Sequence, residues 1–375
     1  MDTPRPLGLY IHIPFCRSKC AYCDFYSLAQ SEEHMDAYVS ALGSSMRAAA
    51  PRAAGYTADT VYFGGGTPGL LGAPRLAALL QMAAECFSIA PGAEITFEAN
   101  PESARDANAL RTLRGAGFNR VSLGMQSADD AELRAIGRAH TARDTEAAVD
   151  AARRAGFDNL SLDLIYGLPG QTCARWRKSL AAAVALAPEH LSCYALKVEP
   201  GTPLYAQKDA AALPDDDAQA DMYLYAAEAL AASGYEQYEI SNFALPGRVS
   251  RHNLKYWTLS EYLGFGPGAH SDFGGRRFAV GRDLGAFLAG NDVHSEDAVI
   301  APRERAAERV MLGLRTAHGI AAEELNLPFG GAEAVLRECA AHGLAAQNAG
   351  RWRLTARGFL VSNAIILRVQ EALAL

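Results

Sequence analysis

Short segments in which apolar and polar residues alternate recur along the first 200 positions of the chain. They read LYIHI, VYFGG, ITFEA, RVSLGMQ, LSLDLI and LSCYAL, and most intervals between them are rich in Ala, Leu and Arg. Strands that alternate with helices predict βαβ units and a parallel sheet. RGAGFNRVSLGMQ and RRAGFDNLSLDLI form a weak repeat, in which Gly117 and Gly156 each follow a predicted helix as C-terminal caps do.

The predicted strands have one apolar and one polar face, because successive side chains of a strand point to opposite sides. The apolar positions are Leu9, Ile11, Ile95, Phe97, Val121, Leu123, Leu160, Leu162 and Leu191. The polar positions are Tyr10, His12, Tyr62, Glu98, Asn100, Gln126, Asp163 and Tyr194. A closed (β/α)8 barrel is filled by branched apolar residues, so six units with a polar inner face predict an incomplete (β/α)6 barrel around a hydrophilic cavity. Polar residues exposed at strand ends stay the alternative.

The composition limits the classes of function. The chain has 375 residues, 50% of them hydrophobic, and its net charge of −7 argues against nucleic acid as a partner. It has no apolar run long enough to cross a bilayer and no signal-peptide pattern, so we expect a cytoplasmic protein without a transmembrane segment. Peripheral contact with a membrane stays open. Four of the seven cysteines are scattered singly, which argues against a disulfide framework, and the tight cluster of the other three predicts metal or redox chemistry.

Cys16, Cys20 and Cys23 form the pattern C-x3-C-x2-C directly after the first predicted strand. Structural zinc needs four ligands, usually in two pairs. The sequence has no second pair, although a single Cys or His from a distant segment stays an alternative fourth ligand. Iron–sulfur clusters are held by thiolates, normally four, so three thiolates on a four-iron cluster would leave one iron open to an outside ligand. The spacing favours an iron–sulfur cluster over zinc.

The segment IHIPFCRSKCAYCDF closely resembles the radical S-adenosylmethionine (SAM) superfamily. The resemblance implies a partial barrel of six βα units, a [4Fe-4S] cluster held by Cys16, Cys20 and Cys23, and a reductant for that cluster. It also implies that the open iron chelates the amino and carboxylate groups of SAM. Within the superfamily the chain is similar, over nearly its whole length, to the coproporphyrinogen-III-oxidase-like branch.

Further motifs match SAM-contacting positions of that branch, including the glycine run of VYFGGGTP, where backbone can approach a ligand closely. The SAM-binding residues implied by the resemblance are Tyr10, Tyr22, Gly65, Gly66, Thr67, Glu98, Gln126, Arg138 and Asp163. In this branch some of these positions serve a second SAM molecule, so the number bound stays open.

The same branch contains an oxygen-independent coproporphyrinogen III dehydrogenase and heme chaperones, which bind heme and transfer it to an acceptor protein. The enzyme's motif continues to a fourth cysteine, and this chain has Phe25 at that position. The enzyme also has a long extension before its cluster motif, whereas only 15 residues precede Cys16 in this chain. The segment SRHNLKYW also contains H-N-x2-Y-W, a motif of the chaperones. These features favour a heme chaperone. The dehydrogenase, or another radical SAM enzyme of porphyrin metabolism, stays the alternative.

The predicted heme-binding residues are those of the motif, His252, Asn253, Tyr256 and Trp257. An imidazole can ligate heme iron, the two aromatic rings offer flat apolar surface, and on a helix His252 and Tyr256 would share one face. A histidine held by a local hydrogen bond in an aromatic patch is the alternative for His252.

Other residues near the motif extend the heme hypothesis. Arg248, Arg251 and Lys255 lie close enough in the sequence to pair with heme propionates. His270, in a glycine-rich stretch that follows, is an alternative ligand.

We predict three regions: residues 1–205 as the radical SAM partial barrel, 206–300 as an extension that flanks the barrel and carries H-N-x2-Y-W, and 301–375 as a C-terminal domain. In the last region, short helices precede a small strand pattern and an apolar helix, which predicts a winged-helix-like α+β fold. Such folds often bind DNA, but the acidic chain favours packing or contacts with partner proteins.

Overall fold

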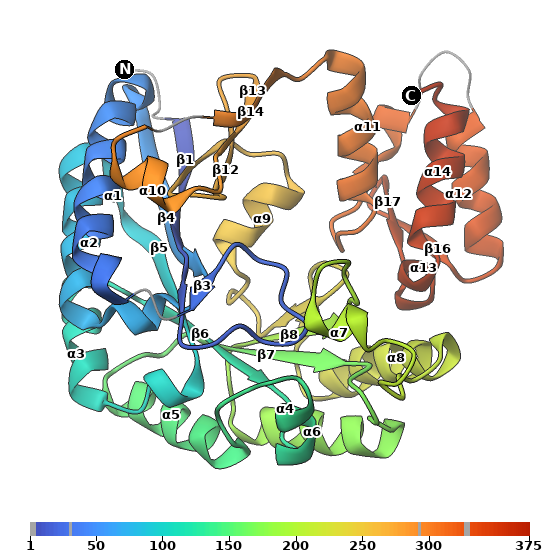
Figure 1. The fold of residues 1–375 in the computed structure, drawn as a ribbon. Coiled ribbons are helices and arrows are strands. Elements are labelled where there is room, and N and C mark those ends of the chain that lie inside the picture. The colour runs from blue at the N-terminus through green and yellow to red at the C-terminus, as the bar shows by residue number, and fades with distance from the viewer. Residues whose placement is uncertain (1–4, 30–31, 292–293, 326–330) are drawn as a thin grey trace.

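The computed structural model of the chain describes residues 5–29, 32–291, 294–325 and 331–375. Parallel strands at the centre of the described fold coincide with the segments that the alternation predicts. They are β1 (Arg5–Ile13), β4 (Tyr56–Gly65), β5 (Ile89–Ala99), β6 (Arg120–Gln126), β7 (Leu160–Tyr166) and β8 (His190–Ala195). Helices cover the outer face of these strands, as Figure 1 shows. The incomplete (β/α)6 barrel of the sequence prediction is confirmed.

The covering helices come from the intervals between the strands. Those longer than eight residues are α1 (Met35–Ala49), α2 (Ala73–Cys86), α3 (Ala107–Ala116), α5 (Ala142–Arg154), α6 (Cys173–Ala185) and α8 (Asp216–Ala232). The shorter helices are α4 (Asp130–Ala135), α7 (Pro203–Ala206), α9 (Arg251–Trp257) and α10 (Leu284–Leu288). Two very short strands, β2 (Phe15–Cys16) and β3 (Leu28–Ala29), pair with each other beside the cysteine loop.

The two faces of the strands separate as the alternation predicts. Leu9, Ile11, Val121 and Leu162 have no exposed surface and belong to the core between strands and helices. Pairing keeps side chains of one kind in line across the sheet, so that Leu162 lies opposite Leu191. Burial of the apolar face fixes the orientation of each strand. The polar face is therefore left around the interior of the barrel.

The sheet continues beyond the barrel strands at both edges. In the described chain its 12 strands run β14-β13-β12-β11-β1-β4-β5-β6-β7-β8-β10-β9. One edge adds β11 (Tyr262–Phe265), β12 (His270–Phe273), β13 (Arg276–Val280) and β14 (His294–Val299), and the other adds β9 (Glu236–Gln237) and β10 (Asn242–Ala244). The region 206–300 thus extends both flanks of the barrel. Its boundary with the barrel at residue 205 stays a prediction.

A C-terminal module follows α11 (Pro302–Gly313). It contains β15 (Ile320–Ala321), α12 (Gly331–Ala341), the hairpin β16 (Ala345–Asn348) and β17 (Arg351–Leu354), α13 (Ala356–Leu360) and α14 (Ser362–Ala372). Helices that pack beside a small hairpin agree with the predicted α+β module. The residues before β15 are tied to the barrel, because Glu239 forms a β-bridge with Thr316 and Ile240 N–H donates to the Arg315 carbonyl at 3.0 Å. No helix of the described chain is long and apolar enough to cross a membrane.

The weak sequence repeat corresponds to a repeated helix end. Gly117 caps α3 with φ +118°, and Phe118 N–H donates to the Leu113 carbonyl at 3.1 Å. Gly156, with φ +92°, is followed in the same way by Phe157, whose N–H donates to the Ala152 carbonyl. Both glycines adopt the left-handed conformation that lets a helix end while the next aromatic side chain enters the core.

We predict that Gly117→Ala lowers the thermal unfolding midpoint, because a Cβ in the left-handed region costs about 1–2 kcal/mol. Gly115→Ala is the matched control. Gly115 lies within α3, and its added Cβ would meet open space, so this substitution should raise the midpoint through helix propensity. Thermal melting curves of the two variants test whether the midpoint shifts in opposite directions. A Gly117→Ala protein as stable as wild type would contradict the proposed role of Gly117 as the C-terminal cap of α3.

Candidate cofactor-binding site

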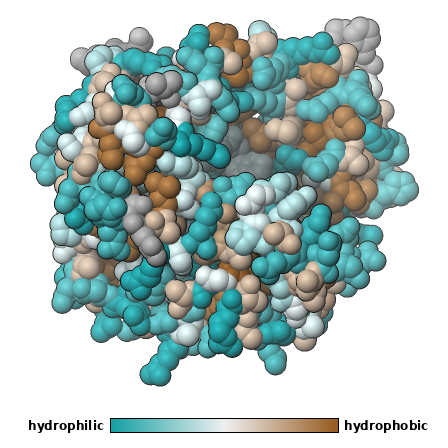
Figure 2. Space-filling model, in the orientation of Figure 1, coloured by the Kyte–Doolittle hydropathy of each residue, from teal (hydrophilic) through white to brown (hydrophobic). Residues whose placement is uncertain are grey.

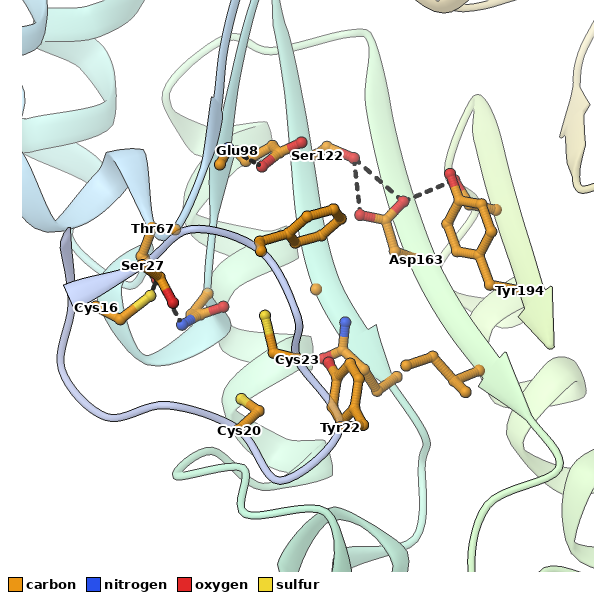
Figure 3. A pocket seen from close by; sticks show the side chains of 18 of the residues that line it. Cys16, Cys20, Tyr22, Cys23, Ser27, Thr67, Glu98, Ser122, Asp163 and Tyr194 are labelled. Atoms are coloured by element: carbon orange, nitrogen blue, oxygen red, sulfur yellow. Dashed lines mark hydrogen bonds between the residues drawn. The ribbon is translucent and has the colours of Figure 1, made fainter. Parts of the chain in front are cut away.

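A cavity of about 530 Å³ lies inside the barrel, at the C-terminal ends of its strands. Its wall includes residues of the loop that carries Cys16, Cys20 and Cys23, as well as inward-facing residues of β4 to β8. Figure 3 shows this arrangement, with the cysteine loop on one side and Glu98, Ser122 and Asp163 across the cavity. The volume is within the range of roughly 300–1,000 Å³ that is usual for small-molecule and cofactor sites.

The cysteine loop is held in place by backbone hydrogen bonds to distant segments. Ala21 N–H donates to the Ile136 carbonyl at 3.1 Å, and the Ala21 carbonyl accepts from Leu204 N–H at 2.9 Å. Leu28 N–H donates to the Pro14 carbonyl at 2.7 Å, which closes the loop at its base. In Figure 3 the three sulfur atoms turn toward a common space. The fold therefore brings together the cysteines that the spacing singled out.

The arrangement of the three cysteines is compatible with a [4Fe-4S] cluster. Among the described residues, no group of three or more His, Cys, Asp or Glu side chains is arranged around one metal ion. The thiolates of a [4Fe-4S] cluster ligate separate iron atoms, so they do not have to meet at one point. Gly66 leaves room beside them, since an added Cβ would lie 2.8 Å from the Phe15 carbonyl oxygen and 3.0 Å from Cys16 Sγ.

The surroundings of the cysteine thiols affect their pKa values. Cys16 Sγ lies 3.6 Å from Thr67 Oγ1, and Arg138 Nη1 lies 3.5 Å from Cys20 Sγ. Burial raises the pKa of the Cys16 and Cys23 thiols. Burial therefore favours the protonated form of the free Cys16 and Cys23 thiols, and binding of iron has to displace those protons.

Glu98 lies at the end of β5 and accepts two hydrogen bonds. Tyr62 Oη donates to it at 2.7 Å and Gly65 N–H at 3.2 Å. Desolvation raises the pKa of Glu98 to about 7, partly offset by these bonds. Glu98 can therefore change charge near neutral pH, and an ammonium group beside it would favour the ionised form.

Arg138 and Gln126 lie side by side in the cavity wall, next to Gly124. Arg138 Nη2 donates to Asn100 Oδ1 at 2.6 Å and to the Gly124 carbonyl at 3.0 Å, while its Nε has no partner. Gln126 ends β6 with φ +55°, and its buried Oε1 also has no hydrogen-bond partner. Two unpartnered buried polar atoms on one cavity wall favour a polar ligand there, because such groups are costly to leave unpaired.

Asp163 lies deeper in the cavity, on β7. Its carboxylate accepts a hydrogen bond from Ser122 Oγ at 3.2 Å (Figure 3). It also accepts one from Ser192 Oγ at 2.7 Å. Burial raises its pKa even though these bonds favour the charged form.

Most of the predicted SAM residues line this cavity, but Tyr10 does not. The wall includes Tyr22, Gly65, Gly66, Thr67, Glu98, Gln126, Arg138 and Asp163. The hydroxyl of Tyr10 instead bonds His12 Nδ1 at 3.0 Å, and its ring stacks on Tyr62 and His252. The structure thus places Tyr10 among the packed aromatic residues behind the cavity.

Sequence reasoning missed several cavity residues, among them Arg120 and His190. Arg120 is 1% exposed, and its Nε and Nη1 have no hydrogen-bond partner. His190 is equally buried, with Nδ1 bonded to Ser161 Oγ and Nε2 to Tyr238 Oη, both at 2.7 Å. Strand periodicity would have found both, because residue 120 shares its face with Gln126 and residue 190 shares its face with Tyr194.

The H-N-x2-Y-W motif forms α9, and its residues face in different directions. Ser250 caps the helix, and Glu94 accepts from the backbone N–H groups of Arg251 and His252 at 3.0 Å each. Asn253 lines the barrel cavity, whereas Trp257 lines a second cavity on the other side of α9. The four residues of the motif therefore do not lie on one common surface.

His252 lies in the interior of the fold. It has no exposed surface, its Nδ1 bonds Thr60 Oγ1 at 2.8 Å, and its Nε2 bonds Tyr256 Oη at 2.9 Å. Its ring stacks on Tyr62 with centroids 5.1 Å apart, and burial lowers its pKa to about 3. His252 and Tyr256 do share one helix face, as expected, but both ring nitrogens are engaged. The structure thus agrees with the alternative of a histidine held within an aromatic patch.

The other heme candidates are placed elsewhere. Lys255 pairs with Asp59 at 2.6 Å, and Arg251 donates to the Gly92 carbonyl at 3.0 Å. His270 is exposed on β12 and lines neither cavity.

Comparison with known proteins agrees with the class that the fold and the cysteine site define, that of the radical SAM proteins. The radical SAM superfamily matches residues 10–182, and the HemN C-terminal domain matches residues 300–361. The structure resembles that of coproporphyrinogen III oxidase (HemN) from Escherichia coli, with a TM-score of 0.83 and 26% identity, covering 97% of this chain and 90% of that one.

The chain belongs to the family of the heme chaperone HemW. It is 39% identical to the heme chaperone HemW of Mycobacterium tuberculosis (strain ATCC 25618 / H37Rv), over 96% of this chain and 94% of that protein. It is 36% identical to the heme chaperone HemW of Escherichia coli (strain K12), over 96% and 97% of the two chains.

We predict that Glu98→Gln weakens the pH dependence of stability. The raised pKa means that the folded state keeps its proton more tightly than the unfolded state, whose Glu98 titrates near 4.5. The contribution of Glu98 to the free energy of unfolding is therefore fully present below pH 4.5, and it is lost as the pH rises through about 7. Glutamine stays neutral, so urea midpoints of the cofactor-free variant should fall less between pH 5 and 8 than those of wild type.

Glu296→Gln, on exposed β14, is the control for this measurement and should follow wild type. If the curves of Glu98→Gln and wild type ran parallel across this range, the assignment to Glu98 would be wrong.

Proposed function

We propose that the protein is a heme chaperone that holds a [4Fe-4S] cluster, binds SAM in the barrel cavity and transfers heme to an acceptor protein. The observation that carries this proposal is the placement of Cys16, Cys20 and Cys23 on one loop at a polar cavity, in a chain related over 96% of its length to heme chaperones. The chain keeps Phe25 where a fourth cysteine would follow, and that side chain lines the cavity.

The cluster ligands in this proposal are the three cysteines, each of which binds one iron. When bound, the cluster supplies an open iron to which SAM can attach through its amino and carboxylate groups. Arg138, close to Cys20, contributes positive charge beside the thiolates and favours their ionised form. Thr67 supports Cys16 through its hydroxyl.

The SAM-binding wall in this proposal consists of Tyr22, Gly65, Gly66, Thr67, Glu98, Gln126, Arg138 and Asp163. Glu98 can accept from the cationic amino group of the ligand, and Arg138 Nε can donate to a carboxylate. The glycines at the end of β4 let the ligand approach the backbone. Asp163, with its two serine donors, is placed to accept from hydroxyl groups such as those of a ribose.

The transfer of heme requires an acceptor protein, and reduction of the cluster requires an electron donor. We place both reactions in the cytoplasm. The described cysteines are all free thiols, and those outside the cluster loop lie in separate elements, α2, α6, β8 and α12, which suits a reducing compartment.

A radical SAM enzyme of porphyrin metabolism is the second candidate. The observation that favours it is the similarity of the whole fold to coproporphyrinogen III oxidase, together with a cavity wall suited to SAM. Anaerobic assay with coproporphyrinogen III, SAM and a reductant distinguishes the two. Formation of protoporphyrinogen coupled to SAM cleavage would support the enzyme and contradict the chaperone.

We predict that Cys20→Ala abolishes cluster assembly, because two remaining thiolates cannot hold the four-iron cluster. Iron and acid-labile sulfide, measured after anaerobic reconstitution, should fall to background. Cys86→Ala, at the end of α2, is the matched control and should keep both. Retention of stoichiometric iron and sulfide in Cys20→Ala would refute the proposed ligand set.

We predict saturable binding of heme by the reconstituted wild-type protein. Titration of the protein into heme should shift the Soret band until one equivalent is bound, since a protein ligand replaces water on the iron. Serum albumin, or a globin lacking heme, then serves as an acceptor, and the band should move to that of the acceptor complex. A linear, unsaturable absorbance change would contradict the proposed function.

A further inference from the structure

A second cavity of about 750 Å³ separates the barrel from the C-terminal module. One wall comes from α9 and the residues after it, with Leu254, Trp257 and Leu259, and the opposite wall comes from Ala317 to Ile320 and α11. Figure 1 shows α9 between the barrel strands and α11, and Figure 2 shows the surface hollowed in this region. The volume again falls in the range of roughly 300–1,000 Å³ for cofactor sites.

The barrel cavity is a poor place for heme. It is the smaller of the two, at about 530 Å³, and its wall already carries the residues that suit the cluster and SAM. His190, the histidine on its wall, has both nitrogens bonded inside the protein. His252 likewise would have to break two hydrogen bonds and leave a fully buried position before it could reach iron.

The other described histidines differ in their access to a cavity. His12 is buried with both ring nitrogens bonded, and His140 is buried with Nε2 bonded to the Met125 carbonyl. His34, His270, His294 and His342 are exposed and line neither cavity. His318 is exposed and lies on the wall of the second cavity, and its ring makes no hydrogen bond or ion pair with any described residue.

The segment that carries His318 is held firmly on both sides. Ala317 N–H donates to the Tyr238 carbonyl at 2.9 Å, and Arg351 donates through Nε to the His318 carbonyl at 3.0 Å. Gly319 has φ +67° and packs so closely against Trp352 that a Cβ would collide with its carbonyl oxygen. The backbone at this position is thus fixed while the imidazole remains free.

We propose that heme binds in this second cavity, with the His318 imidazole as a ligand of its iron and Trp257 against its macrocycle. The proposal rests on the heme-chaperone function proposed above and locates the heme. It also explains how H-N-x2-Y-W takes part without His252 on the iron. Its tryptophan faces the heme, while its histidine and tyrosine anchor α9 to the barrel.

The charges around the cavity suit a heme with two propionates at the open rim. Arg309 is the least engaged cation of the wall, with a side chain 60% exposed and 3.6 Å from Glu324. Arg305 is already held by Asp272 at 2.7 and 2.8 Å. Arg309 is therefore the cation best placed to pair with a propionate. Iron held between two parts of the chain, near the surface, would also be accessible to an acceptor protein.

The test is a heme titration of cluster-reconstituted full-length protein, followed through the Soret band, on wild type, His318→Ala and His342→Ala. We expect His318→Ala to weaken heme binding by about tenfold or more and to lose the spectrum of a histidine-ligated heme. Added imidazole should restore that spectrum. His342→Ala removes an exposed histidine of the same module and should match wild type.

Iron and sulfide content of each variant checks that the barrel is intact. If wild type binds heme and His318→Ala binds it with the same affinity and spectrum, the proposed location is wrong while the chaperone function stands. If wild type itself shows no saturable binding, the proposed function fails. Trp257→Ala gives a second test of the location, because loss of the aromatic wall should weaken binding without changing the ligand spectrum, and unchanged binding would contradict the predicted contact.

Discussion

The rest of the structure depends on one constraint, the polarity of the inward face of the parallel strands. The outward face is apolar and is fixed against the helices, as Leu162 and Val121 show by having no exposed surface. The inward face then has to place carboxylates, a guanidinium and hydroxyls in a confined space. Serine hydroxyls donate hydrogen bonds to Asp163, and Tyr62 donates one to Glu98, so part of the hydrogen-bonding capacity of each carboxylate is used. The remaining unpaired atoms suit a polar ligand, and the cysteine loop lies at the mouth of that space.

Much of this arrangement could be predicted from the sequence, because strand periodicity and cysteine spacing are local signals. The six barrel strands and the polar face around the cavity follow from alternation, and the cap at Gly117 follows from its place after a helix. Arg120 and His190 follow from the same periodicity, although each lies at the first position of its strand, where a polar residue is easily taken for part of a loop. The SAM contact of Tyr10 stays a prediction, and its position behind the cavity wall could not be foreseen, because periodicity gives the face of a strand and not the depth of the cavity.

The heme motif shows where sequence reasoning stops. The spacing of the motif on a helix predicts correctly that His252 and Tyr256 share a face. It does not predict that this face packs into the barrel. That depends on Glu94, more than 150 positions earlier, which holds the first N–H groups of α9. The second cavity is likewise formed by segments far apart in the chain, Trp257 on one side and His318 on the other. No local pattern links them.

The central claim is that three thiolates hold a four-iron cluster whose remaining iron is open to SAM. Electron paramagnetic resonance of the reduced, reconstituted protein tests this most directly, with spectra recorded before and after addition of SAM. The account predicts a signal of a reduced [4Fe-4S] cluster whose g values shift when SAM is added, because a new ligand reaches the open iron. A cluster signal that SAM leaves unchanged, at concentrations that saturate binding, would contradict it.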